Sequence, residues 1–386
     1  MKRIVTLMLC LLAGSAAFAQ DLNITGAGAR AEGFGGAFIG VADDATAIVW
    51  NPAGLTQLER AEASVVTRII SEKAEYTSTF YSSSDFSVSQ THASFNFGSV
   101  ALPFKLGSTT VVIAAAYQRQ IDLYSNLKTD NSSQEGKGGV DTFTPGLSLK
   151  LSPVFSVGAA ANIWTGKHEL TMDRINSRMP SLTQNLTYKG FNMVIGGLVD
   201  LEALPKPVPI KLGVTVRTPF ELKGDGENTV YQTLKANRTV EMPLMLGFGA
   251  SFRLSENFTV AADYEIRSYG EKNMIDELGG SALQPVALSA SGKDLTQVRV
   301  GAEYLFVSKN YVIPLRAGYR TVPTLLANTN ALGVTSDQVT GKAISIGSGY
   351  ISNAFAIDVA YTLTDYTQTF GTTDEIKYTT GTISAS

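Results

Sequence analysis

Several features that define common classes of enzymes and membrane proteins are missing from this sequence. Its only cysteine is Cys10, and its two histidines, His92 and His168, have no spacing typical of a metal site. No nucleophile elbow is present. Beyond residue 19, no apolar run approaches the roughly 18 to 20 residues that a membrane helix requires. We therefore expect no enzyme activity, no cofactor and no metal, and any membrane span must be built from strands.

The N-terminus has the organisation of an export signal. Lys2 and Arg3 precede the apolar stretch 4–12, and the tripeptide AFA at 17–19 fits the small residues that signal peptidase requires. We expect residues 1–19 to be removed, which leaves the mature chain without cysteine and excludes disulfides. Without the two leader cations, 29 of the 31 basic residues stand against 34 acidic ones. This balance offers no basic patch to nucleic acid.

Strict alternation of apolar and polar side chains recurs along most of the chain. It is clearest in 258–267, 297–306 and 353–366. In the first of these, Tyr264 lies on the apolar face and Glu265 on the opposite one. A period of two is typical of β-strands, whereas no helical periodicity of comparable length occurs outside the N-terminal segment. The chain is therefore predicted to be all-β.

The connections between these strands distinguish a membrane barrel from a soluble sandwich, which also alternates. From residue 61 onward we count about 14 strands, whose connections alternate between long and short as in outer-membrane barrels. The long polar connections are 72–87, 122–139, 168–186, 222–238, 269–294 and 322–340, with a shorter one at 367–374. The short turns are 103–108, 152–153, 204–209, 255–257, 308–310 and 352–353. With an even strand number, both termini emerge on the side of the short turns, which we expect to be periplasmic.

Aromatic residues stand at both ends of the apolar face of three strands. At the expected periplasmic ends these are Phe258, Tyr311 and Phe355, and at the outer ends Tyr264, Tyr319 and Tyr361. Two such girdles flank the apolar band of a membrane barrel. A general preference of aromatic residues for strands does not explain why they select one face and both ends.

The opposite face of the strands carries small residues and scattered ions. The small ones include Ala114, Ala116, Gly158, Ala160, Gly213, Gly247, Gly249, Gly347 and Gly349. The ions are Arg217, Arg253, Arg267, Arg299, Arg316 and Asp358, which we expect to pair with one another or with a plug. Small inward side chains leave room for such a plug, and residues 20–60, rich in Gly and Ala, have a matching size. We therefore expect an antiparallel transmembrane β-barrel at 61–386, with residues 20–60 forming a small hatch in its lumen.

The run GARAEGFGGAFIGVADDATAIVWNPAGL at 28–55 resembles the N-terminal signature of the FadL/TodX family of outer-membrane transport proteins for hydrophobic compounds. The similarity continues in 242–270, a Pro-led strand, turn and Asp-Tyr-containing strand, and in the C-terminal strands 314–323, 344–350 and 357–366. It therefore covers most of the expected mature chain. The N-terminal motif is specific, whereas each strand motif taken singly is not.

The resemblance implies a monomeric channel in the bacterial outer membrane, with membrane lipid around it and an apolar small molecule as its ligand. Members of the family take up long-chain fatty acids or aromatic hydrocarbons by passive diffusion. They use an external groove, an internal apolar site, and either a hatch movement or a lateral opening in the wall. Such a path makes physical sense, because exposing apolar surface to water costs roughly 25 cal/mol per Å².

Two sets of candidate site residues follow. The hatch motif comprises Gly33, Gly35, Gly36, Asp43, Asp44, Asn51, Pro52 and Ala53. In it we expect the glycines to allow close packing or positive φ, an aspartate to cap a short helix near Ala45, and Pro52 to fix the turn after Asn51. That joint is either structural or gating. The candidate apolar ligand site comprises Phe34, Phe38, Ile48, Trp50 and Trp164, which would otherwise pack the hatch against the wall.

Two departures from the family pattern limit the resemblance. The chain stops at IKYTTGTISAS without a terminal aromatic residue, so either a few residues are missing or the closing strand is unusual. The third strand, 109–120, has no Pro or Gly interruption, so we do not expect a lateral opening there. The long outer connections, above all 269–294, leave open an alternative function as a docking or shuttle subunit of a protein-secretion system.

Overall fold

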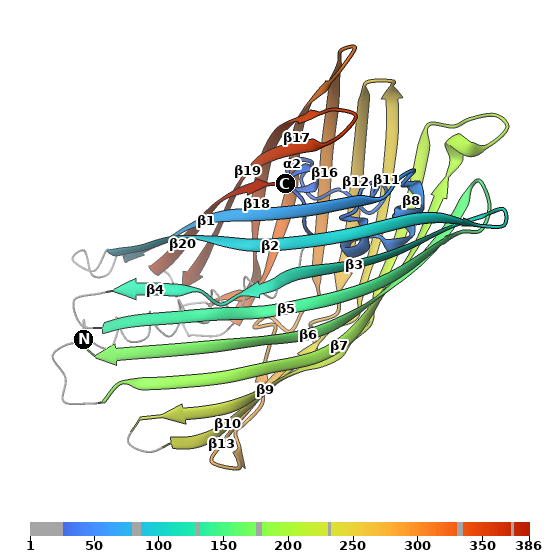
Figure 1. Cartoon of the computed structure of the whole chain (residues 1–386). Coiled ribbons are helices and arrows are strands. Elements are labelled where there is room, and N and C mark those ends of the chain that lie inside the picture. The colour runs from blue at the N-terminus through green and yellow to red at the C-terminus, as the bar shows by residue number, and fades with distance from the viewer. Residues whose placement is uncertain are drawn as a thin grey trace.

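The chain forms one closed antiparallel β-barrel with its N-terminal segment in the lumen. The structure, a computed structural model, describes residues 26–78, 86–128, 132–174, 180–230, 233–329, 335–371 and 374–386, so the predicted export signal lies outside the described residues. Each barrel strand pairs with the next, and β20 (Asp374–Ala385) pairs with β1 (Glu62–Ser78) to close the ring (Figure 1). The expected 14-stranded barrel with a hatch is confirmed.

Some barrel strands consist of two segments in line. β7 pairs with both β8 and β9, which are separated by Thr218 and Pro219, and β10 and β11 are separated at Pro243. Proline interrupts the ladder because it lacks an N–H. Between β1 and β20 the barrel strands are β2 (Phe86–Leu106), β3 (Thr109–Asp122) with β4 (Ser125–Lys128), β5 (Ser132–Lys150), β6 (Phe155–Arg174), β7 (Leu182–Asp200), β8 (Ile210–Arg217) with β9 (Phe220–Thr229), β10 (Thr233–Met242) with β11 (Met245–Ser255), β12 (Phe258–Arg267) with β13 (Asn273–Leu278), β16 (Leu295–Val307), β17 (Val312–Thr329), β18 (Thr335–Ile351) and β19 (Ala356–Phe370).

Along the lipid-facing band, beside the hatch, the barrel is apolar outside and largely polar or small inside, as the alternation predicts. Along β12, Tyr264 is 43% exposed on the outer surface, whereas the inward Asp263 is 3% exposed. The aromatic residues of the two predicted girdles also lie on the outward face, where Tyr311 stacks on Tyr350 at 5.5 Å between ring centroids. In a water-soluble sheet the apolar face would be the buried one, so this surface is suited to lipid.

The strands run farther than their polarity indicates. The stretch 168–186, expected as a long polar connection, belongs largely to β6 and β7. Likewise β17 and β18 occupy most of 322–340. Polar side chains mark the end of the lipid-facing band and not the end of the backbone ladder, so the predicted boundaries were wrong. The connection 269–294 contains β13 and the two-residue strands β14 (Ser281–Ala282) and β15 (Val286–Ala287).

The short turns lie together at one end of the barrel, as predicted. They include Gly107 and Ser108 between β2 and β3, and Glu256 and Asn257 between β11 and β12. A short 3-10 helix, η2 (Leu201–Ala203), begins the connection from β7 to β8. We call this the hatch end of the barrel and the opposite end the loop end.

The hatch, defined here as residues 26–61, is compact and almost completely buried. It contains α2 (Ala29–Gly33), α3 (Ala47–Trp50) and the 3-10 helix η1 (Pro52–Gln57). Figure 1 shows this blue segment inside the ring of strands. α2 contacts β17 to β19, and η1 contacts β5 to β7, so the hatch spans the lumen. Within the described part of the chain, no helix is long and apolar enough to cross a membrane.

The hatch backbone touches the barrel wall at inward glycines. A Cβ on Gly301 would lie 2.1 Å from the carbonyl oxygen of Phe34, and one on Gly318 would lie 2.1 Å from the amide nitrogen of Gly35. Side-chain carbons do not approach other atoms so closely, so any larger residue would displace the hatch. We call the wall glycines that meet the hatch in this way the glycine belt: Gly158, Gly196, Gly213, Gly249, Gly301, Gly318 and Gly347.

Replacing one glycine of the belt should loosen the hatch without dissolving the barrel. In Gly196→Ala the new methyl group would lie 2.1 Å from Oδ1 of Asn51, whereas in the matched control Gly197→Ala it would meet only the flexible side chain of Val214, at 3.2 Å. Overpacking of this kind costs about 1–3 kcal/mol, which corresponds to about 5- to 150-fold more undocked hatch. We expect limited proteolysis to cut the hatch faster in Gly196→Ala alone, with heat-modifiable barrels in both variants. Equal cleavage would contradict the close contact.

Candidate functional site

Asn51 joins the hatch to the barrel wall. Its Nδ2 donates to the carbonyl oxygens of Ile39, at 2.9 Å, and Gly197, at 3.1 Å. Its Oδ1 accepts from the amide of Ala53 at 3.2 Å, so Asn51 also caps η1, in which Pro52 is the first residue. The side chain is fully buried and all of its groups face a partner. Asn51 thus ties two parts of the hatch to β7.

The glycines of the hatch motif lie in tight turns or against the wall, and the helix that follows them is short. Gly35 and Gly36 have φ of 69° and 76°, and Gly33 packs directly on Gly347. The helix expected near Ala45 begins at Ala47 instead, and the side chain of its N-cap residue, Thr46, makes no capping hydrogen bond. Asp44 Oδ1 accepts from the amide of Thr46 at 2.8 Å and so stabilises the preceding turn.

Ion pairs hold the hatch on the opposite side of the lumen, as expected for the inward charges. Glu32 accepts from Arg68 at 2.7 Å and from Arg320 at 3.0 Å. Arg30 lies between Asp43, at 2.5 Å, and Glu303, at 3.3 Å. Both charged residues of α2 therefore bind wall strands.

A wall carboxylate binds hatch backbone directly. Asp263 Oδ2 accepts from the amides of Phe38, at 2.8 Å, and Ile39, at 3.0 Å. Its neighbour Glu265 instead pairs with two wall arginines, Arg267 at 2.5 Å and Arg299 at 3.3 Å. The predicted pairing of inward ions with one another and with the plug is confirmed by these contacts.

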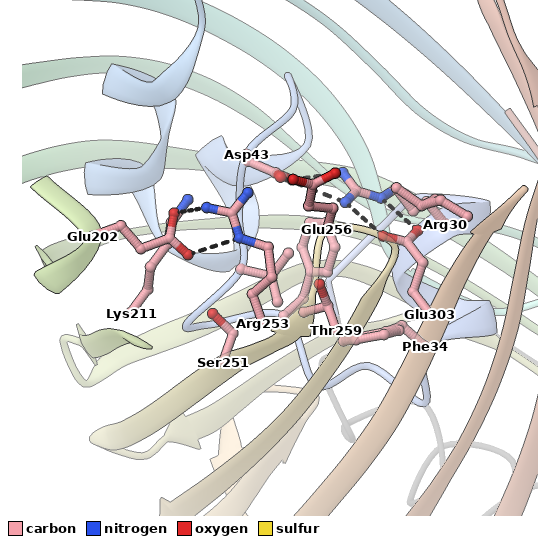
Figure 2. A pocket seen from close by; sticks show the side chains of 13 residues that line it. Arg30, Phe34, Asp43, Glu202, Lys211, Ser251, Arg253, Glu256, Thr259 and Glu303 are labelled. Carbon is pink, nitrogen blue, oxygen red and sulfur yellow. Dashed lines mark hydrogen bonds and ion pairs between the residues drawn. The ribbon is translucent and has the colours of Figure 1, made fainter. Parts of the chain in front are cut away.

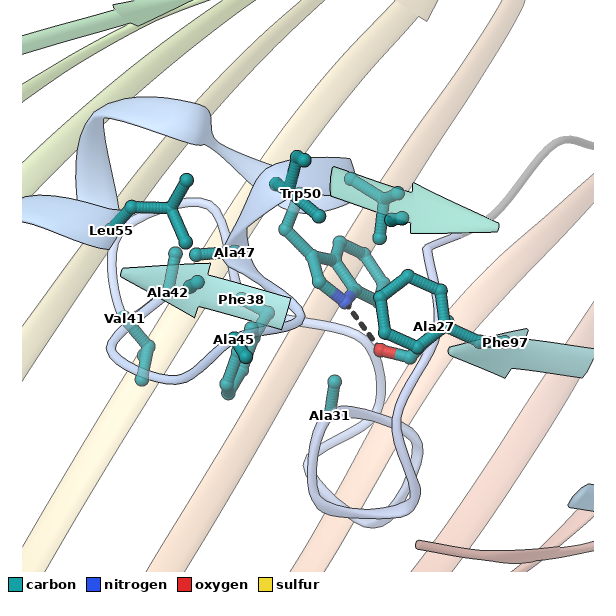
Figure 3. Close-up of a cluster of buried hydrophobic side chains, with 14 of the residues drawn as sticks. Ala27, Ala31, Phe38, Val41, Ala42, Ala45, Ala47, Trp50, Leu55 and Phe97 are labelled. Atoms are coloured by element: carbon teal, nitrogen blue, oxygen red, sulfur yellow. Dashed lines mark hydrogen bonds between the residues drawn. The ribbon is translucent and has the colours of Figure 1, made fainter. Parts of the chain in front are cut away.

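Four of the five candidate ligand residues pack within the hatch itself. Phe34, Phe38, Ile48 and Trp50 belong to one buried cluster with wall residues such as Phe97 (Figure 3). The indole N–H of Trp50 donates to the carbonyl oxygen of Ala27 at 2.8 Å. The ring of Phe38 meets that of Trp50 edge-on, with 5.9 Å between centroids. These side chains form the core of the plug.

Trp164, the fifth candidate, lies in a separate apolar cluster on the loop-end side of the hatch. Its ring packs on Phe220 at 4.9 Å, and its N–H donates to Asn192 at 2.8 Å. The sequence did not single out the other members, because buried apolar residues on polar strand extensions carry no motif. We call the following group the lumen cluster: Ile121, Leu123, Val140, Trp164, Leu186, Tyr188, Leu222, Ala236, Val240, Met242, Met245, Tyr269, Leu295 and Leu325.

A cavity of about 200 Å³ lies at the hatch end, between the hatch and the wall (Figure 2). Phe34 and Phe38 form part of its lining, together with ions of both signs. Figure 2 shows Arg30 between Asp43 and Glu303, and the Arg253–Glu202 ion pair on the other side. This cavity therefore differs in character from the lumen cluster, and its charges make it a poor site for an apolar molecule.

The barrel wall is interrupted between its second and third strands, contrary to the sequence expectation. The ladder between β2 and β3 ends at Phe97 and Gln118. Beyond that point β3 stays bonded to β5 through a bulge at Gln120, and then breaks at Leu123 and Tyr124 before β4 begins. Within the described stretch 86–128, no ladder joins β2 to the remainder of β3 or to β4. We call this interruption the wall break.

The wall break adjoins the lumen cluster. Ile121 and Leu123, on the kinked side of the break, are both buried members of that cluster. The prediction was based on the absence of Pro and Gly within the strand itself. The kink instead accompanies the bulge at Gln120 and the positive φ, 101°, of Gly138 on the neighbouring strand. An extra residue in one strand re-aims the backbone without a marker in its own sequence.

No cluster of three or more potential metal ligands occurs among the residues that the structure describes. In comparisons with known proteins, neither a family model nor a curated protein matches the sequence. Solved structures do match. A FadL homologue from Pseudomonas aeruginosa has a TM-score of 0.68, and the toluene transporters TbuX from Ralstonia pickettii and TodX from Pseudomonas putida each have 0.60.

In all three comparisons the identity is 13%, and the similarity covers 94% of this chain and 98% of the other. At this identity the match concerns the fold. The expected resemblance to the FadL and TodX barrels is therefore confirmed for the whole architecture.

Asn51 provides a test of the joint between hatch and wall. Asn51→Ala and Asn51→Asp both leave the carbonyl oxygens of Ile39 and Gly197 without their donor, but Asp keeps an acceptor for Ala53. An unsatisfied buried polar group costs about 1–3 kcal/mol. We expect hydrogen exchange of hatch amides to accelerate in both variants while the barrel strands keep their protection. Loss of strand protection would mean that Asn51 is needed for the barrel itself.

The ion pairs of Glu32 should make the docking of the hatch dependent on pH. Burial alone would raise the pKa of Glu32, but Arg320 and Arg68 outweigh it and hold the pKa below its ordinary value of 4.5. Because the folded pKa is the lower one, the ion pairs stabilise docking above the unfolded pKa, and this contribution is lost as the pH falls through the folded value. Hatch amides should therefore keep their protection down to pH 4.5 and lose part of it below. Glu32→Gln should weaken protection at neutral pH and reduce this acid dependence.

Proposed function

We propose that this protein is an outer-membrane channel for the passive uptake of apolar small molecules, either aromatic hydrocarbons or long-chain fatty acids. The hatch end would face the periplasm, together with both chain termini, and the loop end would face the medium. The outward apolar surface, with lipid as its surroundings, and the similarity to transport barrels support this assignment. The closed ring of one chain supports a monomer as the working unit.

The lumen cluster is the observation that carries the proposal. A channel for polar solutes needs a wet lining, whereas here Leu222, Val240 and Leu295 are among the inward side chains on the loop-end side of the hatch. Each Å² of apolar solute kept out of water is worth roughly 25 cal/mol. Trp164 would offer a flat apolar contact within this cluster, and the hatch residues Phe34, Phe38, Ile48 and Trp50 would hold the plug beneath it.

The wall break supports lateral release into the membrane. An apolar molecule in the lumen cluster would reach the break past Ile121 and Leu123 without crossing the hatch. The alternative route, through the hatch, would require release of Asn51, Glu32 and Arg30 together and would lead to the ion-lined cavity. Passage through the wall avoids both requirements.

Uptake by cells with and without the protein tests the proposal. Labelled toluene and a labelled long-chain fatty acid are the substrates, and a small sugar is the polar control. We expect faster uptake of at least one apolar substrate and no change for the sugar. Unchanged uptake of both apolar substrates, together with co-purification of a secretion complex, would favour the docking function instead.

Leu222 gives a matched pair of variants for the same assay. Leu222 is fully buried on β9 within the lumen cluster. Leu222→Gln places a polar group on the path, whereas Leu222→Met keeps the site apolar. We expect uptake about tenfold slower in Leu222→Gln, which corresponds to about 1.4 kcal/mol, and unchanged in Leu222→Met. Equal rates in both variants would exclude this part of the lumen from the path.

A further inference from the structure

The wall break is closed by side chains in place of a backbone ladder. Asn126 donates its amide hydrogen to Oε1 of Gln90 across the break, at 2.8 Å. Nearer to the hatch end, Nδ2 of Asn96 donates to the carbonyl oxygen of Arg119 at 3.4 Å. Between these two contacts, His92 on β2 meets Asp122 and Tyr124 on the kinked strand. The opposing strands are therefore held through rotatable groups.

His92 is the centre of this closure. Its Nε2 lies 3.2 Å from Oδ2 of Asp122. Its ring stacks on Tyr124 with 4.4 Å between centroids and 27° between planes. Oδ1 of Asp122 accepts from the amide of Tyr124 at 3.2 Å, which orients the carboxylate toward the histidine. Three residues thus form one contact unit that spans the break.

This closure differs physically from the rest of the wall. Along a laddered part of the wall, such as β1 with β2, neighbouring strands are joined by runs of backbone hydrogen bonds, which separate only when a strand leaves the sheet. A stacked and hydrogen-bonded side-chain unit opens by rotamer changes, which need no movement of the barrel. The wall break therefore opens more readily than a laddered stretch of the wall, and it lies beside Ile121 and Leu123 of the lumen cluster.

We propose that His92, Asp122 and Tyr124 form a latch that closes the wall break, and that its opening gates the passage of apolar molecules from the lumen cluster into the membrane. The inference rests on the proposed transport function and adds its gate. Opening exchanges the contacts of His92 for contacts with the passing molecule, so the latch keeps the barrel sealed when no apolar molecule is present.

Chemical cross-linking of the full-length protein tests the latch. The expected mature chain has no cysteine, so the pair His92→Cys and Tyr124→Cys can be joined by a short bifunctional maleimide across the break. The matched control is Ser71→Cys with Thr91→Cys, which lie opposite each other on β1 and β2 and whose hydroxyl oxygens are 3.0 Å apart. We expect cross-linking to stop uptake of toluene or fatty acid at the break and to leave uptake unchanged in the control. Normal uptake through the cross-linked break would overturn the latch.

Variants that weaken the latch should speed uptake, whereas cross-linking should stop it. Tyr124→Ala removes the stacked ring, whereas Tyr124→Phe keeps it. We expect Tyr124→Ala to take up the apolar substrate about fivefold faster, as the loss of one modest contact implies, and Tyr124→Phe to match the unchanged protein. Equal rates for Ala and Phe, with heat-modifiable barrels in both, would contradict the latch. Absence of uptake by the unchanged protein would refute the transport function itself, so the two failures are distinguishable.

Discussion

The close contact between hatch backbone and barrel wall is the constraint on which the rest of the structure depends. At the glycine belt the wall offers no side chain, so the hatch lies against bare backbone on several strands at once. At these contacts there is no space for water, and the hatch fits against the wall in a single position. The buried hydrogen bonds of Asn51 and Asp263 then become possible, because their partners are held at fixed positions. Packing and polar contacts here reinforce each other.

A plug held in this way changes where movement is expected. The hatch is fixed by backbone packing, by the ion pairs of Glu32 and Arg30, and by the apolar core around Trp50. The wall break lacks the backbone packing of the glycine belt, and every contact named across it depends on at least one side chain. The wall between β2 and β3 is therefore more weakly closed than the hatch, and this difference is the basis of the proposed lateral route.

Much of the architecture was predictable because it follows from residue-by-residue periodicity. Alternation gave the strand number and the apolar outer face, and the short turns carry recognisable polar and Pro- or Gly-containing signals. The hatch motif gave Asn51 and the positive-φ glycines Gly35 and Gly36. Strand ends were missed, since a strand that leaves the lipid becomes polar without leaving the sheet. The helix begins at Ala47 and not near Ala45, since Asp44 binds the amide of Thr46 in the turn that precedes it.

The sequence by itself determined a barrel, its apolar outer surface and a plug of suitable size, because each of these follows from local periodicity and composition. Only the tertiary structure decided how the interior divides. It put Phe34, Phe38, Ile48 and Trp50 in the core of the plug, and Trp164, on β6, in the separate lumen cluster. It also decided that the backbone ladder between β2 and β3 ends at Gln118, before Leu123. These features depend on strand register and on a bulge, which set neighbours across the ring and leave no mark along the chain.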